Sequence, residues 1–397
     1  MKVLLMDVNC KYSSTGKIVY DLYTKLREDG HEAAIAYGRG SLVGEENIYR
    51  FSPQWEVYLH ALLTRITGYT SCFSYIATRR AIKYIEKFQP EVVHLHDMHG
   101  YFVNIITLAE YLKKKRIKTV WTFHCEFMYT GKCGHAYECE KWKTQCGKCP
   151  RLHEYPKSQL FDCTKSMQKR KKAILSNWRL LTIVTPSEWL QSRVQKSFLH
   201  DKKVMVVHNG TDTSVFQPQM TEKLREKLRI ENKKVVLAVA PNLMSEEKGG
   251  NYVLKIAEKC ENGDIVFILV GANEELDYCG NNVISVGTIK DNKVLAQYYS
   301  LADAFVICSK KETFSMTTVE ALCCGTPVVG FCAGAPEAIA LKEYSTFVEY
   351  GNLNKLTMAL LDVLERNESN REQIALVAKK HYSKDVMTRK YFEIYKQ

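Results

Sequence analysis

The chain has 397 residues, an apolar content of 46% and a formal net charge of +12, from 56 basic and 44 acidic side chains. This length is typical of two domains or one large domain, and the composition is that of a globular protein rather than a disordered one. No segment reaches the roughly 18 apolar residues that a membrane-spanning helix needs. The basic charge leaves nucleic acid, acidic lipid and an anionic substrate open as partners.

Short apolar strands alternate with helices along the first half of the chain. The expected strands are 3–8, 31–37, 91–96, 119–123, 181–185 and 204–207, with a helix over 16–29. This alternation predicts a parallel α/β sheet. The first strand is too short, and too soon broken by Asp7, to be a signal peptide, so we expect a cytoplasmic protein whose 14 cysteines are mostly reduced.

The loop after the first strand, residues 9–17, contains Gly16. Ligands of doubly wound sheets bind beyond the carboxyl ends of the strands, and a glycine allows close approach of a ligand to the backbone. The loop lacks both the G-x-G-x-x-G pattern and the GK[ST] step of known nucleotide-binding loops. The alternative is an ordinary helix cap formed by Ser14 or Thr15.

Histidines follow two of the expected strands. His124 comes directly after the strand 119–123, and His94, His96 and His99 cluster around the end of the strand before it. A lone histidine at a strand end is a hydrogen-bonded residue as readily as a ligand contact. The spacing of His94 and His96 also permits a metal site, although a strand that simply ends near a ligand site is the plainer interpretation.

Four cysteines occur within 17 residues, at Cys133, Cys139, Cys146 and Cys149. The final C-x2-C spacing is typical of structural zinc sites, whereas the preceding C-x5-C spacing is less so. Free buried thiols and redox chemistry are the alternatives to zinc. Two basic runs, 113–118 and 165–172, favour either solvated helix faces or attraction to an anionic membrane surface.

A second series of strands begins after the Asn-Gly turn and Pro218 in the segment 208–218. The expected strands are 234–240, 264–270, 283–286, 304–308 and 328–331. Lys248 follows the first of them and precedes two glycines, a combination suited to a diphosphate. The sequence contains no Asp-x-Asp pair that would hold Mg²⁺ or Mn²⁺ on such a group, so we expect no metal cofactor in catalysis.

Glu312 and Glu320 stand eight residues apart, followed by Gly325-Thr326-Pro327 and an apolar strand. Residues 309–315 are expected to form a loop and 317–324 the first turns of a helix. A loop that enters a helix offers free amides and the positive end of the helix dipole, which favours phosphate binding. The candidate amides are those of Thr313, Phe314 and Ser315.

This stretch resembles the glutamate-pair motif of the retaining glycosyltransferases of family 4, which have the GT-B fold. The run 121–158, with its Lys141-Trp-Lys and Tyr155-Pro-Lys-Ser158 steps, resembles a narrower subgroup, the colanic-acid type of bacterial polysaccharide-assembly transferases, and that likeness covers most of residues 1–216. The resemblance implies two Rossmann-like doubly wound domains facing a cleft. Their expected bounds are 1–210 on the acceptor side and 211–382 on the nucleotide-sugar side, with a final helix, 383–397, crossing back onto the first domain.

The resemblance also implies roles for the candidate residues. Glu312 and His124 would contact the donor sugar as catalytic residues, and Glu320 would contact the ribose. Lys248, Gly16 and the 313–315 amides would lie at the donor phosphates. Family members often carry an arginine near the place of Asn242, so here Lys248 would neutralise the phosphates alone.

The sequence therefore predicts a retaining hexosyltransferase that moves a sugar from a nucleotide-diphosphate sugar to an acceptor hydroxyl. The expected acceptor is a glycan or lipid-linked oligosaccharide of capsule, exopolysaccharide or O-antigen synthesis. We expect the protein at the inner face of the cytoplasmic membrane, with no nucleic-acid partner. The alternatives are a GT-B nucleotide-sugar epimerase and a basic, zinc-bearing protein that binds nucleic acid or a membrane surface.

Overall fold

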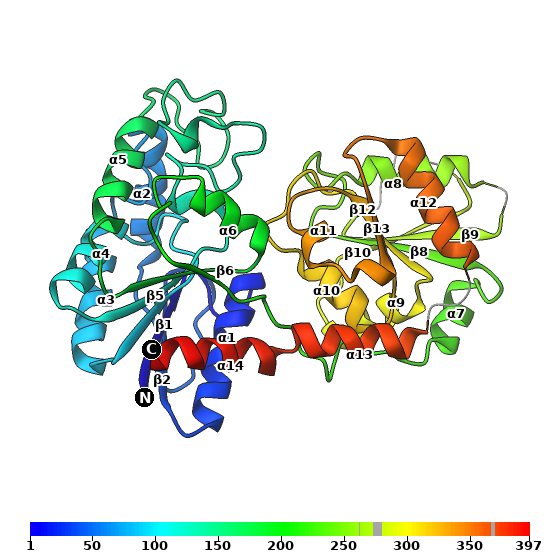
Figure 1. Ribbon diagram of the computed structural model, residues 1–397, viewed down its shortest axis with the longest axis horizontal. Helices are drawn as coiled ribbons and strands as arrows, with labels where there is room; N and C mark the ends of the chain where they lie inside the picture. Colours follow the sequence, from blue (N-terminus) through cyan, green and yellow to red (C-terminus); the bar gives the residue numbers. More distant parts are fainter. Residues whose placement is uncertain (262, 273–279, 367–369) are drawn as a thin grey trace. The chain divides into compact units, whose positions relative to one another are not determined.

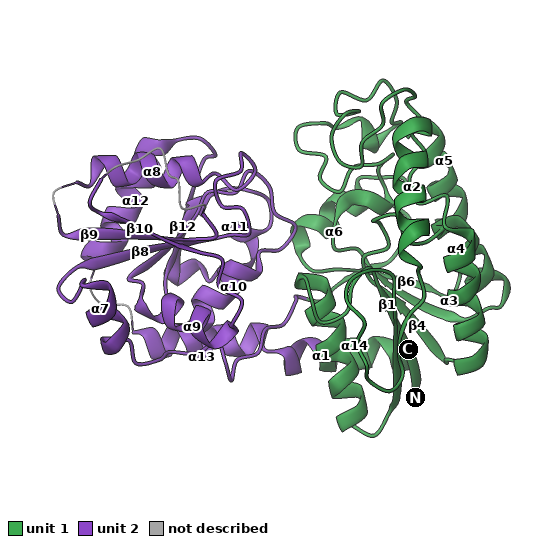
Figure 2. Cartoon of the chain, turned by 180° about the vertical axis from the view of Figure 1, so that it is seen from behind, with its two compact units in different colours: residues 1–207, 388–397 green, residues 208–387 purple. Residues whose placement is uncertain are grey.

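The computed structural model describes residues 1–261, 263–272, 280–366 and 370–397 (Figure 1). The chain divides into two compact units, residues 1–207 with 388–397 and residues 208–387 (Figure 2). Each unit is built on its own parallel sheet. No described helix combines the length and the apolar character needed to cross a membrane.

Unit 1 contains a seven-stranded sheet in the order β3-β2-β1-β4-β5-β6-β7, in which every pair of neighbours is parallel. The strands are β1 Lys2–Asp7, β2 Glu32–Tyr37, β3 Ile48–Arg50, β4 Val92–Leu95, β5 Lys118–Thr122, β6 Leu181–Thr185 and β7 Val204–Val206. The helices are α1 Ser14–Glu28, α2 Gln54–Thr67, α3 Tyr75–Phe88, α4 Ile105–Lys114, α5 Thr164–Leu175 and α6 Glu188–Gln195.

Unit 2 contains a six-stranded parallel sheet in the order β10-β9-β8-β11-β12-β13. The strands are β8 Lys234–Val239, β9 Ile265–Val270, β10 Val283–Gly287, β11 Ala304–Ile307, β12 Val328–Phe331 and β13 Ser345–Val348. The helices are α7 Glu222–Leu228, α8 Gly250–Lys259, α9 Asn292–Leu301, α10 Met316–Cys323, α11 Pro336–Ile339, α12 Leu353–Glu365 and α13 Arg371–Tyr382, and the last helix, α14 Lys384–Lys396, is divided between the two units.

The apolar runs of the sequence form the central strands because helices cover both faces of a parallel sheet. Residues 3–6 of β1 and 235–237 of β8 are fully buried. The predicted fold class is confirmed, since both sheets are parallel and are built from alternating strands and helices. The short strands β3 and β13 were not predicted, because neither carries a long apolar run.

The last helix, α14, begins in unit 2 and ends in unit 1. Its Tyr391 and Tyr395 are fully or almost fully buried in unit 1. The Tyr395 hydroxyl lies 2.6 Å from Nδ1 of His94 on β4, and the Tyr391 hydroxyl lies 2.9 Å from Oγ1 of Thr122 on β5. These contacts anchor the C-terminus of the chain to the unit that contains its N-terminus.

Candidate functional site

In unit 2 the strand order reverses between β8 and β11, which is where ligands of doubly wound sheets bind. The loops that leave β8, β11 and β12 meet there. The amide of Lys310 donates to the carbonyl of Glu247 over 2.9 Å, and the amide of Glu312 donates to the carbonyl of Ala333, also over 2.9 Å. Backbone hydrogen bonds therefore hold three loops together at the carboxyl edge of this sheet.

Two of the predicted site residues are in direct contact at this edge. The ammonium of Lys248, after β8, lies 2.6 Å from Oε1 of Glu312, after β11. Both side chains are partly exposed. Gly249 follows Lys248 with a φ of 71°, and a Cβ at that position would lie 2.4 Å from the carbonyl oxygen of Cys308. Only glycine fits this close approach, so the turn that carries Lys248 depends on it.

The predicted loop-to-helix step leads into α10. Ser315 is its N-cap, and its hydroxyl accepts a hydrogen bond from the amide of Thr318 over 3.3 Å. The φ of Ser315 is 98°, a strained value for a residue with a side chain, and such strain is concentrated at functional sites. Phe314 is buried, while Thr313 is half-buried. The first amides of α10 have no partner within the helix, so this end can receive an anion.

Glu320 lies in the middle of α10, and its Oε2 accepts a hydrogen bond from the hydroxyl of Tyr299 on α9 over 3.1 Å. Burial, together with the nearby Glu320 carboxylate, raises the pKa of Tyr299 well above its usual value, so Tyr299 remains a donor at neutral pH. The contact fixes the orientation of Glu320 on the helix.

In unit 1 the strand order reverses between β1 and β4. Asp7, the last residue of β1, connects the loop that leaves β4 with the first turn of α1. Its Oδ1 accepts a hydrogen bond from the amide of Asp97 over 2.9 Å, and its Oδ2 accepts one from the hydroxyl of Thr15 over 3.1 Å. The sequence analysis named Asp7 only as the residue that breaks the first apolar run, although a carboxylate near a strand end, before a glycine-containing loop, was an available signal.

Gly16 lies in the first turn of α1, where its amide donates to the Ser13 hydroxyl over 3.1 Å. A Cβ at Gly16 would lie 3.2 Å from that hydroxyl, so the turn is tightly packed. The loop does provide a helix cap, as the alternative held, but the capping residue is Ser13 and not Ser14 or Thr15. Both of those residues belong to the helix itself.

Burial raises the pKa of Asp7 to about 7, and the nearby Asp97 carboxylate adds to the effect. Because this pKa is higher in the folded chain than in the unfolded chain, the folded state binds the proton more tightly. The contribution of Asp7 to stability is therefore full below pH ~4 and is lost as the pH rises through ~7.

Asp7→Asn should remove this dependence while keeping an acceptor oxygen for the Asp97 amide. Relative to the wild type, the variant should gain on the order of 4 kcal/mol between pH 4 and pH 8. Urea unfolding at both pH values measures the change. Asp29→Asn, at the exposed end of α1, is the control, and equal pH dependence of Asp7→Asn and the wild type would contradict the assignment.

His124 lies directly beyond β5, and its Nε2 is 3.0 Å from Nδ1 of His96. Burial lowers the pKa of His124 to about 4 and that of His96 well below its usual value, so both rings are neutral at pH 7. His94 bonds to Thr122 and Tyr395 instead, so it is a structural residue of the sheet. The ring of His124 is thus an uncharged hydrogen-bonding group at neutral pH.

A cluster that sequence reasoning did not assemble lies beside these histidines. Nε2 of His99 is 3.0 Å from Oδ1 of Asp97, and each of Asp97, His99 and Cys125 places one ligand atom within 4.8 Å of the others. Burial alone would lower the pKa of His99, but Asp97 and Cys125 hold it well above its usual value. The residues come from consecutive strand ends, β4 and β5, and this adjacency was the signal that could have revealed them.

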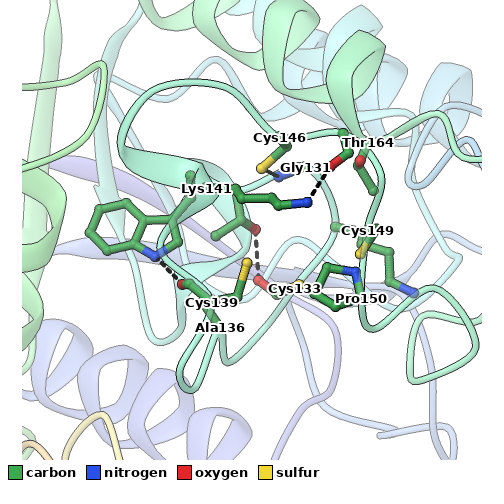
Figure 3. Close-up of a pocket in the computed structure, with 13 residues that line it drawn as sticks. Gly131, Cys133, Ala136, Cys139, Lys141, Cys146, Cys149, Pro150 and Thr164 are labelled. Carbon is green, nitrogen blue, oxygen red and sulfur yellow. Dashed lines mark hydrogen bonds between the residues drawn. The ribbon is translucent and has the colours of Figure 1, made fainter.

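The four predicted metal-ligating cysteines line one pocket in the long segment between β5 and α5 (Figure 3). All four are half-buried free thiols. The Cys133 thiol, and to a lesser extent the Arg151 amide, lowers the pKa of Cys149 to about 6, while burial opposes this shift. In the described residues the only three ligand atoms all within 4.8 Å of one another are those of Asp97, His99 and Cys125, so no three of the four sulfurs lie that close together.

Comparison with known proteins agrees with this geometry. A model of the family described as Glycosyltransferase Family 4 matches residues 15–215, half of the chain, and one described as Glycosyl transferases group 1 matches residues 233–366. The putative colanic acid biosynthesis glycosyl transferase WcaC of Escherichia coli K12 is 22% identical over 357 residues, which cover 86% of each chain.

Solved structures share the fold. Sucrose-phosphate synthase from Thermosynechococcus elongatus superposes with a TM-score of 0.70 at 15% identity, over 100% of this chain and 98% of the other. Anabaena HepE in complex with UDP gives a TM-score of 0.69 at 16% identity, over 99% of each chain. The chain belongs to glycosyltransferase family 4, and its two parallel-sheet units are those of the GT-B fold.

Proposed function

We propose that the protein is a retaining hexosyltransferase that uses a nucleotide-diphosphate sugar. The observation that carries this proposal is the meeting of Lys248, Glu312 and the N-terminus of α10 at the switch point of unit 2. A cation and the amides at a helix N-terminus suit a diphosphate, and a carboxylate suits sugar hydroxyls. The structural relative HepE, which binds UDP, supports the same assignment.

In this mechanism the anomeric C1–O bond to the diphosphate breaks, and a new C1–O bond to the acceptor forms on the same face of the sugar. The proton of the acceptor hydroxyl passes to the departing phosphate oxygen. Lys248 and the amides of Thr313, Phe314 and Ser315 would stabilise the charge that develops on the leaving group. Glu320 would contact the ribose, and the neutral His124 would hydrogen-bond to the donor sugar. Gly16 would allow close approach of the donor phosphates.

The Lys248–Glu312 ion pair fits a substrate-dependent exchange of partners. Without donor, each charge compensates the other over 2.6 Å. A bound diphosphate would take over Lys248 and leave the Glu312 carboxylate to accept hydrogen bonds from sugar hydroxyls. Binding of the donor would thus prepare the carboxylate for its catalytic contact.

A screen of nucleotide sugars tests the proposal. We expect one donor to be consumed, with release of a nucleoside diphosphate and transfer of the sugar with its anomeric configuration retained. Product analysis by NMR distinguishes transfer from epimerisation, because an epimerase would return a nucleotide sugar. Failure of every donor to bind to the protein would contradict the assignment of unit 2.

We further propose that the acceptor is carried on a lipid and that unit 1 contacts the membrane surface through α2. Five large apolar side chains of this helix are exposed, whereas three of its four buried side chains, Glu56, His60 and Thr64, are polar. Its large outward side chains are 41 to 66% exposed and share one face; they are Trp55, Tyr58, Leu59, Leu62 and Ile66. An apolar face of this size on a surface helix is typical of an interaction site.

The buried polar side chains of α2 form hydrogen bonds at the N-terminus of α3. The buried carboxylate of Glu56 accepts hydrogen bonds from the amides of Ile76 and Ala77, at the N-terminus of α3, over 2.9 and 2.8 Å. His60 lies 2.7 Å from the hydroxyl of Ser74. These contacts satisfy the first turn of α3 and leave the apolar side of α2 outward.

Basic side chains of α5 lie near the C-terminal end of α2. The Arg170 guanidinium of α5 stacks on Tyr69, just beyond the end of α2, at 4.7 Å from the ring centroid. Lys165, Lys169 and Lys172 of the same helix are exposed. An exposed apolar helix face with basic side chains nearby favours an anionic lipid surface as the partner. Each basic group near such a surface contributes ~1 kcal/mol to binding.

Leu62→Glu should lower binding to phosphatidylglycerol vesicles at least about tenfold. The change removes an apolar side chain that the lipid would bury, and it adds a negative charge that the anionic surface repels. Vesicle flotation measures the loss, and circular dichroism checks the fold. Leu376→Glu is the matched control, since Leu376 is 49% exposed on α13 and Leu62 is 52% exposed. Equal binding of Leu62→Glu and the wild type, or equal loss in both variants, would contradict the role of α2.

A further inference from the structure

The segment 126–163 of unit 1 has little regular structure of its own. Among its residues only Glu126–Met128 and Lys141–Lys143 form short 3-10 helices. It nevertheless holds buried side chains, among them Trp142 and Tyr129. A segment of this length that has so few backbone hydrogen bonds from helices or strands needs other interactions to hold it in one conformation.

Part of that order comes from two buried lysines. Lys132 is 2% exposed and donates to the carbonyls of Arg151, Leu152 and Glu154 over 2.6 to 2.9 Å. Lys171 of α5 is fully buried and donates to the carbonyls of Phe127 and Thr130 over 2.6 and 3.1 Å. The basic run 165–172 is therefore not a wholly solvated face, because Lys171 points inward.

Neither of these ammonium groups forms an ion pair with a carboxylate in the described part of the chain. Carbonyl groups solvate a buried cation but do not neutralise it, and a buried charge is costly unless an opposite charge lies nearby. Lys132 precedes Cys133 and lines the cysteine pocket, and Lys171 contacts Thr130 in its wall. The negative charges that act on Lys132 are those of Cys149, Cys133 and the more distant carboxylates Glu154 and Asp162, whereas those that act on Lys171 come from cysteines alone.

The C-x2-C turn is held in place from outside. The amide of Cys146 donates to Oε1 of Gln168 over 2.7 Å, and the amide of Cys149 donates to Oδ2 of Asp162 over 2.7 Å. The Cys146 sulfur accepts a hydrogen bond from the amide of Gly131 over 3.2 Å. Lys141 donates to the carbonyls of Gly147 and Lys148 between the two cysteines and reaches across the pocket (Figure 3).

We propose that Cys133, Cys139, Cys146 and Cys149 bind one Zn²⁺ as a closed structural site. Four thiolates favour Zn²⁺ in tetrahedral geometry, and a full set of protein ligands leaves no position for substrate. The resulting complex carries a net charge of −2, which compensates the Lys132 and Lys171 cations. Zn–S bonds of about 2.3 Å would place the four sulfurs at about 3.8 Å from one another.

The ion would order the segment that positions the end of β5. The segment begins at Glu126, two residues after His124, and Trp142 packs beside Tyr129 with ring centroids 5.2 Å apart. The Arg193 guanidinium stacks on Trp142 at 4.6 Å. Closing the cysteines around zinc would therefore hold Trp142, and through it this edge of unit 1, in place. The zinc ion would take no part in glycosyl transfer. The proposed zinc site therefore stands or falls independently of the proposed transferase activity.

Metal analysis of the whole protein, purified under reducing conditions without added metal, tests the proposal directly. We expect about one Zn²⁺ per chain, released in step with the modification of four thiols by a mercurial reagent. Exchange for Co²⁺ should give the intense visible absorption of tetrahedral cobalt thiolate. Protein that contains no zinc, takes up no Zn²⁺ or Co²⁺, and has all four thiols free or two of them joined in a disulfide would overturn the site.

Variants identify the ligands. Cys146→Ser and Cys149→Ser should each lose most of the zinc, and Cys163→Ser should retain it, because Cys163 lies outside the pocket at the start of α5. Cys125→Ser tests whether the metal binds instead at the cluster of Asp97, His99 and Cys125. Loss of zinc in Cys125→Ser with retention in Cys146→Ser would place the ion there and overturn the proposal. If the cysteine variants fail to fold, metal content and thiol release in the wild type still decide.

Discussion

Glu312→Gln should lower kcat on the order of 100-fold or more with its natural donor, with little change in stability. The amide keeps the shape of the side chain but loses the charge that pairs with Lys248 at 2.6 Å and that would accept sugar hydroxyls in the transition state. Loss of one transition-state contact of this kind costs roughly 3–4 kcal/mol. Steady-state kinetics under saturating donor measures the effect.

Two further variants separate catalysis from binding. Lys248→Met should weaken the binding of nucleoside diphosphate more than that of nucleoside, because only the former needs the cation. Glu246→Gln is the control, since Glu246 is highly exposed and pairs with Lys310 in the same loop region. Near-normal turnover of Glu312→Gln would remove Glu312 from the site, and equal loss of both ligands in Lys248→Met would separate Lys248 from the phosphates.

Arg193→Met should destabilise unit 1 by about 3–5 kcal/mol. Glu126 is fully buried, and its carboxylate accepts hydrogen bonds from Arg193 Nε over 2.6 Å, the Tyr129 hydroxyl over 2.7 Å and the Ala136 amide over 2.6 Å. Removing the guanidinium leaves a buried negative charge without its counter-ion. It also removes the cation that stacks on Trp142.

Tryptophan fluorescence during urea unfolding measures this effect, because all five tryptophans lie within residues 1–207 and so report on unit 1 alone. Lys25→Met is the control, since Lys25 forms exposed pairs with Glu28 and Asp29 on α1. Exposed pairs contribute about 0–1 kcal/mol. A shift for Arg193→Met no larger than that of Lys25→Met would show that Glu126 does not need the guanidinium.

The sequence by itself determined the fold class and the family. Strands of a parallel sheet are covered on both faces, so β1, β8 and β9 are continuous apolar runs that can be recognised without any tertiary contact. The transition from loop to helix at Ser315 could also be predicted, since polar residues, a helix start and a Gly-Thr-Pro turn follow one another along the chain. Local order of this kind depends on neighbours in sequence.

Contacts between residues far apart in the chain were decided only by the tertiary structure. The Lys248–Glu312 pair and the Asp97–His99–Cys125 cluster arise because parallel strands bring their carboxyl ends to one edge, whatever their distance in sequence. The polar face of α2 is buried because α3 needs Glu56 and His60 as partners, which a helical periodicity cannot reveal. Lys171 likewise sits in a basic run but is buried, because the carbonyls that solvate it belong to a segment some 40 residues earlier.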